Sequence, residues 1–503
     1  MKNSTICKTA FNNYYLICQL GSYFVYLPSL LRYFIEKGLI FDNETNQIPE
    51  MIGLENHKYN KEEISYYYSK YLFLKDHGLI NILKRPGERK FSGFITEDDI
   101  KWRLANLPQL VFEVTDMCNL KCEYCGYGDL YDNHGKRGKK KMTFKTAKVI
   151  LDYLFDLWQS EVEFSFRKNL TLGFYGGEPL LNIKLIKKII KYVELIRPPM
   201  VNFSFSITTN GMLLDKYMDF LVSKNFMVLI SLDGNESNNC YRIKHDCTNS
   251  FKQVYHNIKL LQQKHPNYFD SMCSLVSVLH NRNSVSDIRN FINNEFGKIP
   301  TILEVSNLGI DPKMQEEFNR IYRNQIEDII QADNCNDFTS SFEIINPFFL
   351  GAADFIQHLV RNCFRRYSDL IEKEENRIYV PTGTCIPFER KMFITVSGEI
   401  LTCERIGNKP ILGRVLDNKV ELDLKGISLK YNNLYKAIRK QCRHCYNYLS
   451  CTKCLFHLKN FEEKLICDQF QNIEQMKEYC EYNISFFESN PEAYIKAKQL
   501  SIE

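Results

Sequence analysis

Residues 110–125, which read LVFEVTDMCNLKCEYC, decide the fold. The first five are rich in β-branched and aromatic side chains and predict a short buried strand. Directly after them stand Cys118, Cys122 and Cys125, so one short loop carries three thiols. In barrels built from strand and helix pairs, the working residues lie on the loops that follow the strands. This stretch therefore predicts an α/β fold whose chemistry lies at the carboxyl ends of its strands.

From this stretch onward the chain alternates between strand and helix in units of about 30 residues, a pattern typical of βαβ construction and a parallel sheet. The predicted strands are 110–114, 170–174, 203–208, 227–232, 272–279 and 302–306. The predicted helices between them are 143–158, 182–195, 214–224, 251–263 and 285–294. Six strands of this kind predict a partial (β/α)6 barrel.

The chain has 503 residues, which is too long for one core, and at about 150 residues per domain it should form about three domains. Hydrophobic residues make up 44% and charged residues 25%, which excludes a fibrous or disordered class. The predicted parts are an N-terminal module 1–105, the barrel 106–310, a helical bridge 311–382, a Cys-rich domain 383–485 and a tail 486–503. Within the N-terminal module, a Tyr-rich stretch predicts a helix that ends at Gly78.

Net charge and hydropathy restrict the partners and the compartment that we expect for this chain. The net charge of +5 is small for so large a surface and gives no support for a nucleic-acid partner. The longest charge-free run, 9–31, is broken by polar residues, Gly21 and Pro28, so we expect neither a membrane-spanning helix nor a secretory signal. The expected compartment is therefore the cytoplasm, where thiols stay reduced. There, 18 cysteines indicate metal binding or redox chemistry rather than disulfides.

Three thiolates on one loop suit a [4Fe–4S] cluster in which one iron has no protein ligand. The alternative is zinc, but a structural zinc site uses four ligands in paired knuckles, and no fourth Cys or His is adjacent.

Further short motifs follow the next strands. The segment Gly176, Gly177, Glu178 and Pro179 comes after the second strand, where glycines let the backbone approach a charged ligand. TTNG at 208–211 follows the third strand and SLDG at 231–234 the fourth. Each of these could be an ordinary turn if it stood alone, but together they come in order at the expected edge.

The cysteine spacing with its aromatic Tyr124, together with these three motifs, resembles the radical S-adenosylmethionine (SAM) enzymes. The resemblance implies that SAM binds the open iron and is cleaved to a 5′-deoxyadenosyl radical, and that the GGEP segment holds the SAM ammonium group. It also implies a set of SAM-binding residues: Tyr124, Gly176, Gly177, Glu178, Pro179, Thr208, Asn210, Ser231, Asp233 and Arg242. For Arg242 an exposed surface position is an equally acceptable interpretation. No acid or base is singled out by the sequence.

A second group of cysteines resembles the SPASM extension of radical SAM peptide maturases, although its last pair is one residue closer than usual. The resemblance implies two auxiliary [4Fe–4S] clusters, which gives three clusters in all. The first would use Cys385, Cys403 and Cys454, and the second Cys442, Cys445, Cys451 and Cys467. The fourth ligand of the first cluster is Cys363 or Cys480, or its iron is open. A zinc ribbon is the alternative, but the spacer between its two pairs is too short for the common kinds.

Taken together, the resemblance implies a radical SAM enzyme that modifies a ribosomally made precursor peptide and forms a thioether between a Cys sulfur and a carbon. Its alternatives are formylglycine formation, as in sulfatase maturation, a carbon–carbon cross-link, and a non-catalytic iron–sulfur or zinc protein. Residues 1–105 would then be a winged-helix-like module that binds the leader of the peptide, or a plain structural domain. The implied electron donor is a flavodoxin or ferredoxin, with no nucleic-acid or membrane partner.

Overall fold

The computed structural model describes residues 4–18, 23–38, 48–55, 57–77, 80, 94–132, 138–159, 168–196, 201–332, 347–359, 380, 386–407, 410–447, 451, 453–461 and 464–499. The chain forms two compact units. The first comprises Met1–Phe94, Thr339–Thr384 and Leu434–Glu503, and the second Ile95–Phe338 and Cys385–Asn433.

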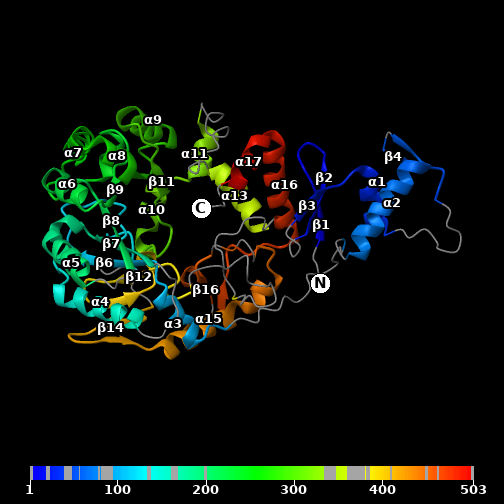
Figure 1. Ribbon diagram of the computed structural model, residues 1–503. Helices are drawn as coiled ribbons and strands as arrows, with labels where there is room; N and C mark the ends of the chain where they lie inside the picture. The colour runs from blue at the N-terminus through cyan, green and yellow to red at the C-terminus, as the bar shows by residue number, and fades with distance from the viewer. Residues whose placement is uncertain are drawn as a thin grey trace. The chain divides into compact units, whose positions relative to one another are not determined.

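Six parallel strands form the centre of the second unit (Figure 1). They are β6 (Gln109–Thr115), β7 (Lys168–Gly176), β8 (Val201–Thr209), β9 (Met227–Ser231), β10 (Cys273–Leu279) and β11 (Thr301–Glu304), and they lie in chain order across the sheet. All but the first residue of β6 are buried, as expected of a parallel strand that is covered on both faces. The partial (β/α)6 barrel is therefore confirmed, strand by strand.

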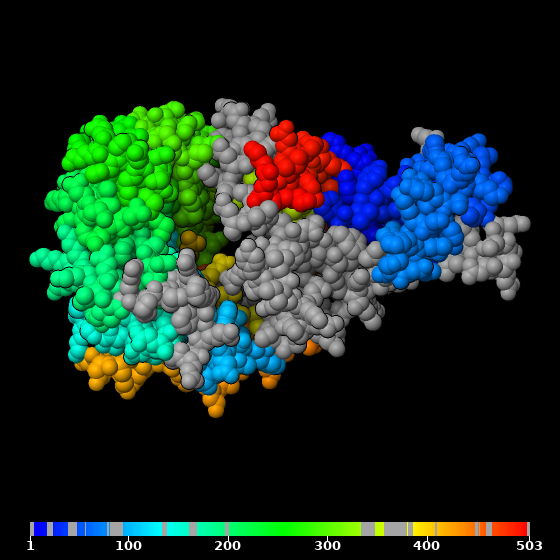
Figure 2. Space-filling view, viewed as in Figure 1, coloured from blue at the N-terminus to red at the C-terminus, as the bar shows by residue number. Residues whose placement is uncertain are grey.

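The five predicted helices between these strands are present as α4 (Phe144–Gln159), α5 (Ile183–Ile196), α6 (Leu214–Ser223), α7 (Phe251–Lys264) and α9 (Val285–Phe296). A further short helix, α8 (Pro266–Met272), was not predicted. Each of the longer helices buries one apolar stripe; in α5 the buried residues are spaced three and four apart, from Ile183 to Val193. In the space-filling view this cyan-to-green part of the chain forms one continuous body (Figure 2).

The sheet continues beyond β6 into four short strands from the later part of the sequence. These are β12 (Met392–Ile394), β13 (Glu399–Leu401), β14 (Gly413–Val415) and β15 (Val420–Leu422). Strand β12 pairs in parallel with β6, and the rest are antiparallel. The β12–β13 pair is a hairpin that turns at Gly398, whose φ of 82° suits glycine.

The N-terminal part of the first unit has a three-stranded antiparallel sheet, β1 (Ser4–Lys8), β2 (Tyr14–Cys18) and β3 (Tyr23–Tyr26). It is followed by α1 (Ser29–Lys37), the hairpin of β4 (Met51–Leu54) and β5 (His57–Asn60), and α2 (Lys61–Asp76). The last of these is the predicted Tyr-rich helix, whereas Gly78 lies outside the described residues. Buried apolar residues of β2, α1 and α2 form one core.

Another core of the first unit joins β1 to three helices: α13 (Pro347–Leu359), α16 (Ile473–Ser489) and α17 (Pro491–Gln499). This unit also contains the hairpin of β16 (Lys459–Phe461) and β17 (Lys464–Ile466) and the short η6 (Leu455–His457). Of the helix α15 (Leu424–His444), the residues up to Asn433 belong to the second unit and those from Leu434 to the first. In the second unit the remaining helices are α3 (Glu97–Ala105), α10 (Gln315–Ile321), α11 (Gln325–Gln331), η1 (Pro179–Asn182), η2 (Asn238–Tyr241), η3 (Pro312–Met314) and η5 (Glu404–Ile406).

The predicted five-part domain organisation stays a prediction. Among the described residues no helix is both long enough and apolar enough to cross a membrane.

Candidate active site

The three predicted cluster ligands, Cys118, Cys122 and Cys125, lie on the loop that follows β6, and all are half-buried. This loop is fixed by backbone hydrogen bonds to the end of η2 and the residues that follow it. Lys121 N–H donates to Ile243 O at 2.7 Å, and Glu123 N–H donates to Tyr241 O at 3.2 Å. The thiols therefore stand on a loop whose backbone is held in place by the barrel itself.

The two glycines of the GGEP segment lie against the start of this loop. A Cβ at Gly176 would lie 2.1 Å from Thr115 O, and one at Gly177 would lie 2.2 Å from Met117 O. The N–H groups of Gly177 and Glu178 donate to those same two oxygens, at 2.9 and 2.8 Å. Glycine is needed here because the two backbones touch. These N–H groups are therefore occupied. The backbone carbonyl oxygens of this segment are the groups that can accept a hydrogen bond from an ammonium ion.

The side chain of Glu178 is fully buried and faces the third motif. Its carboxylate accepts from Thr209 Oγ1 at 2.8 Å, Asn210 N at 2.8 Å and Leu180 N at 3.1 Å. Burial raises the pKa of Glu178 to about 7, although these hydrogen bonds act in the opposite direction. Glu178 thus joins the loop after β7 to the loop after β8, and Pro179 next to it is buried.

The TTNG and SLDG residues have different surroundings. Thr208 and Ser231 are half-buried near the ends of β8 and β9. Asn210 is buried, and its amide nitrogen contacts Cys118 Sγ at 3.6 Å. The structure therefore brings the third motif directly to the cysteine loop.

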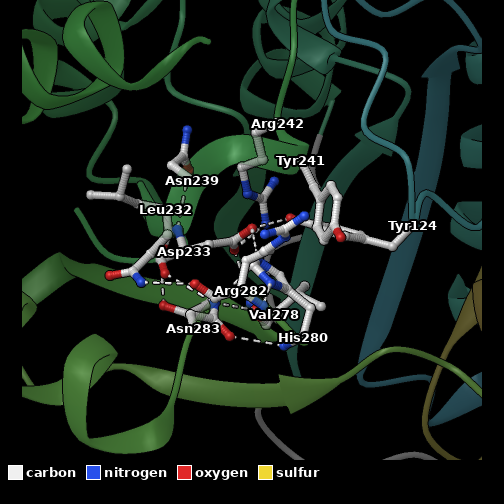
Figure 3. A network of polar contacts seen from close by, with 12 residues as sticks. Tyr124, Leu232, Asp233, Asn239, Tyr241, Arg242, Val278, His280, Arg282 and Asn283 are labelled. Atoms are coloured by element: carbon white, nitrogen blue, oxygen red, sulfur yellow. Dashed lines mark hydrogen bonds and ion pairs between the residues drawn. The ribbon is translucent and has the colours of Figure 1, made fainter. Parts of the chain in front are cut away.

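Asp233 is the centre of a buried polar network (Figure 3). Its carboxylate accepts from the Tyr124 hydroxyl and from Val278 N at 2.9 Å, and it forms an ion pair with Arg242 Nη2 at 3.0 Å. Burial raises the pKa of Tyr124 well above its usual value. The guanidinium of Arg242 lies 5.5 Å from the centre of the Tyr124 ring, a cation–π distance. Arg242 is thus a buried residue and not the exposed surface arginine of the alternative interpretation.

His280 belongs to this network and was missed by the sequence analysis. It follows β10 directly, is fully buried and stacks on Tyr124 with ring centroids 5.9 Å apart. Burial lowers the pKa of His280 to about 4, so the ring is neutral at neutral pH. Its Nδ1 accepts from Arg282 N–H at 3.1 Å, which places the ring proton on Nε2. Its position after a barrel strand was the available signal, but a single histidine carries little information by itself.

Two observations test whether these residues fit a cluster that binds SAM. Among the described residues, the buried Nε of Arg242 has no hydrogen-bond partner, which leaves a donor available for a carboxylate such as that of an amino acid ligand. No three His, Cys, Asp or Glu side chains in the described part of the chain are arranged to hold a single metal ion. The donor set itself, three half-buried thiols on one short loop, is of the kind that binds an iron–sulfur cluster. The residues of this site therefore fit a cluster that binds SAM.

The C-terminal cysteines are distributed over both units. In the second unit, Cys403 follows β13, accepts from Arg405 N–H at 3.3 Å and has a pKa that burial raises to about 12. Cys385 and Cys363 lie outside the described residues. Cys480 is fully buried in the core that joins β1 to α16, and its pKa is raised first by a hydrogen bond with Cys7.

The remaining five cysteines belong to the first unit: Cys442, Cys445, Cys451, Cys454 and Cys467. Cys445 N–H donates to Cys442 O at 3.2 Å, and the Cys445 sulfur accepts from Gln471 N–H at 3.5 Å. The pKa of Cys467 is raised by burial and next by the nearby thiols of Cys451 and Cys445. Three of the four ligands predicted for the second auxiliary cluster are therefore neighbours, and the complete ligand sets stay a prediction.

Comparison with known proteins identifies the class. Residues 112–293 match the Radical SAM superfamily, so the chain contains a radical SAM domain, which is an enzyme domain, as the sequence predicted. Those residues span β6 to α9 and carry the three-cysteine loop together with all three motifs.

Individual relatives place that domain among known enzymes. The chain is 31% identical over 163 residues to a cysteine-type anaerobic sulfatase-maturating enzyme of Clostridium novyi (strain NT), covering 32% of this chain and 41% of that protein. It is 24% identical over 216 residues to the radical SAM cyclopropyl synthase TigE of Paramaledivibacter caminithermalis, covering 41% of this chain and 42% of that protein. The chain thus spans about two fifths of the length of these relatives.

A solved structure of native anSMEcpe with bound AdoMet and a Kp18Cys peptide shares the fold. It superposes with a TM-score of 0.52 at 17% identity and covers 78% of this chain and 99% of that one. The likeness supports the barrel architecture described above.

Proposed function

We propose that this chain is a radical SAM enzyme that modifies a ribosomally made precursor peptide by hydrogen abstraction and joins a Cys sulfur of the peptide to a carbon as a thioether. The observation that carries the proposal is the three-thiol loop, which the GGEP backbone and the segment 241–243 hold in place. The buried Arg242 lies against Tyr124 of this loop, and its Nε has no hydrogen-bond partner among the described residues. A non-catalytic iron–sulfur protein would have no use for such an arrangement.

Cys118, Cys122 and Cys125 would hold a [4Fe–4S] cluster, which with SAM bound would supply a carbon-centred radical able to remove a hydrogen atom from the substrate. The residues of the chain itself bind SAM and orient it. Arg242 offers Nε–H to the SAM carboxylate, while its ion pair with Asp233 fixes the guanidinium. Carbonyl oxygens of the GGEP segment accept from the ammonium group, and the buried Tyr124 and His280 rings help to exclude water.

The thioether itself is proposed from the C-terminal cysteines. Cys385, Cys403 and Cys454 would bind the first auxiliary cluster, and Cys442, Cys445, Cys451 and Cys467 the second. A cluster with an open iron would bind the substrate Cys as a thiolate and would accept the electron released when a carbon radical bonds to that sulfur. The proposed partners are the peptide, whose leader binds residues 1–105, and a flavodoxin or ferredoxin as electron donor. The proposed compartment is the cytoplasm.

A second candidate is conversion of a substrate Cys to formylglycine. It is favoured by the 31% identity to the Clostridium novyi sulfatase-maturating enzyme. A carbon–carbon cross-link is a third outcome of the same radical chemistry, and the similarity to the cyclopropyl synthase favours it.

The test is incubation of the anaerobically reconstituted protein with SAM, a reductant and Cys-containing precursor peptides, followed by mass spectrometry. A loss of two hydrogens with no free thiol left, even after treatment with a disulfide reductant, indicates a thioether. Replacement of sulfur by oxygen together with a loss of two hydrogens indicates formylglycine, and a loss of two hydrogens with the thiol retained indicates a carbon–carbon bond. Either of the last two results would overturn the thioether proposal. Cys118→Ala should abolish all products, whereas Cys247→Ala, at an exposed cysteine that is not a predicted ligand, should not.

A further inference from the structure

The amide of Asn210 is oriented by three hydrogen bonds, and their directions can be assigned. Its Oδ1 accepts from Met212 N–H at 3.0 Å, which identifies the oxygen end of the amide. The Nδ2 end therefore faces the cysteine loop, where it donates to Asn119 Oδ1 at 2.7 Å and to Cys118 Sγ at 3.6 Å. Both protons of the amide are thus used, one on an oxygen and the other on a sulfur.

The backbone of Asn210 is fixed as firmly as its side chain. Its N–H donates to Glu178 Oε2 at 2.8 Å, and the neighbouring Thr209 hydroxyl donates to Oε1 of the same carboxylate at 2.8 Å. Only 8% of Asn210 is exposed, so water does not compete strongly for the amide. The direction of the N–H group toward sulfur is therefore set by the fold.

Cys118 Sγ also accepts from Leu120 N–H at 3.4 Å. Hydrogen bonds to a cluster's thiolate sulfurs stabilise the added negative charge of the reduced state and raise its reduction potential. The Leu120 donor belongs to the cysteine loop itself, but the Asn210 donor comes from the loop after β8, more than 90 residues away.

We propose that Asn210 is a positioning residue that holds an N–H donor on the Cys118 thiolate and thereby raises the reduction potential of the loop cluster. This role differs from the SAM contact expected of Asn210 from its motif. It rests on the proposed function, because it requires the cluster to form on Cys118, Cys122 and Cys125.

The test is a redox titration of the reconstituted protein followed by electron paramagnetic resonance. The signal of the loop cluster is the one missing from a Cys118→Ala/Cys122→Ala/Cys125→Ala variant. Asn210→Leu removes the donor at similar volume and should make the midpoint potential of this signal more negative. Asn210→Asp keeps an acceptor for Met212 N–H and turns an oxygen toward the sulfur, so its shift should be larger in the same direction.

Asn257→Ala is the matched control. Asn257 is buried like Asn210, and its Nδ2 donates to Gly211 O and Met212 O of the same loop, not to a sulfur of the cysteine loop. It should leave the potential unchanged. The proposal is overturned if Asn210→Leu and Asn210→Asp bind iron as the wild type does and keep its potential, or if Asn257→Ala shifts the potential equally. A wild-type protein that forms no loop cluster would overturn the proposed function as well.

Discussion

At the scale of single residues, the carboxylate of Glu178 shows how burial and hydrogen bonding oppose each other at the site. Three donors face it, yet burial holds its pKa near 7, above the ordinary value of a glutamate. The charged form is therefore less favourable in the folded protein than in the unfolded chain.

This raised pKa predicts a pH dependence of stability. Between the ordinary glutamate pKa and about 7, the folded state binds more protons than the unfolded state, so the Glu178 contribution to stability is present at low pH and falls as the pH rises through that window. Glu178→Gln removes this titration and turns an amide N–H group toward other donors. The melting temperature should be lower in the variant, and its deficit should shrink from about pH 4.5 to 7. A deficit that stays constant or grows over that range contradicts the assignment.

A second residue-scale prediction concerns the contact between the GGEP segment and the cysteine loop. In Gly177→Ala the new Cβ would meet the backbone oxygen of Met117 at 2.2 Å, so one of the two segments must move. We expect a loss of about 1–3 kcal/mol in urea unfolding, as for other overpacked sites, and less bound iron after reconstitution. Gly126→Ala is the control, because a Cβ there has open space although Gly126 follows Cys125 directly. Equal behaviour of the two variants would mean that the close contact does not matter.

At the scale of elements, the turn between β10 and α9 holds His280 in place. His280 N–H donates to Asn283 Oδ1 at 2.8 Å, and Asn283 Nδ2 donates to Asp233 O at 3.2 Å and to Val278 O at 3.0 Å. The helix that follows is capped by Ser284, whose Oγ accepts from Asp287 N–H at 3.0 Å. The turn, the network around Asp233 and the helix start are therefore one connected structure.

Ser284→Ala should destabilise the barrel by about 1 kcal/mol, because the cap of α9 is lost. Ser284→Asp keeps an acceptor at the same position and should restore most of that loss, and the carboxylate also interacts favourably with the helix N-terminus. Chemical denaturation of the three proteins measures both effects. If the alanine and aspartate variants are equally unstable, capping is not the cause.

At the scale of the whole molecule, the sequence predicted the barrel well and the contacts of its site only in part. Parallel strands buried on both faces give continuous apolar runs, so β6 to β11 were predicted to within about two residues. The places of the GGEP, TTNG and SLDG motifs in the barrel were predicted as well, because each motif directly follows a strand in the sequence. By contrast, the approach of Asn210 to Cys118 depends on how two distant loops meet. The pair of Asp233 with Arg242 depends on how the segment after β9 folds back on itself, and no local pattern encodes either contact. The place of His280 in the site could be recognised only from the structure, in which its ring stacks on that of Tyr124.

The central claim is that the loop of Cys118, Cys122 and Cys125 holds a cluster that cleaves SAM. The measurement that tests it most directly is the 5′-deoxyadenosine formed from SAM by the anaerobically reconstituted, reduced protein, compared with the variant in which all three cysteines are Ala. We predict 5′-deoxyadenosine from the wild type and none from the variant, with about four fewer irons per chain in the variant. Wild-type protein that carries its full iron but forms no 5′-deoxyadenosine would contradict the account.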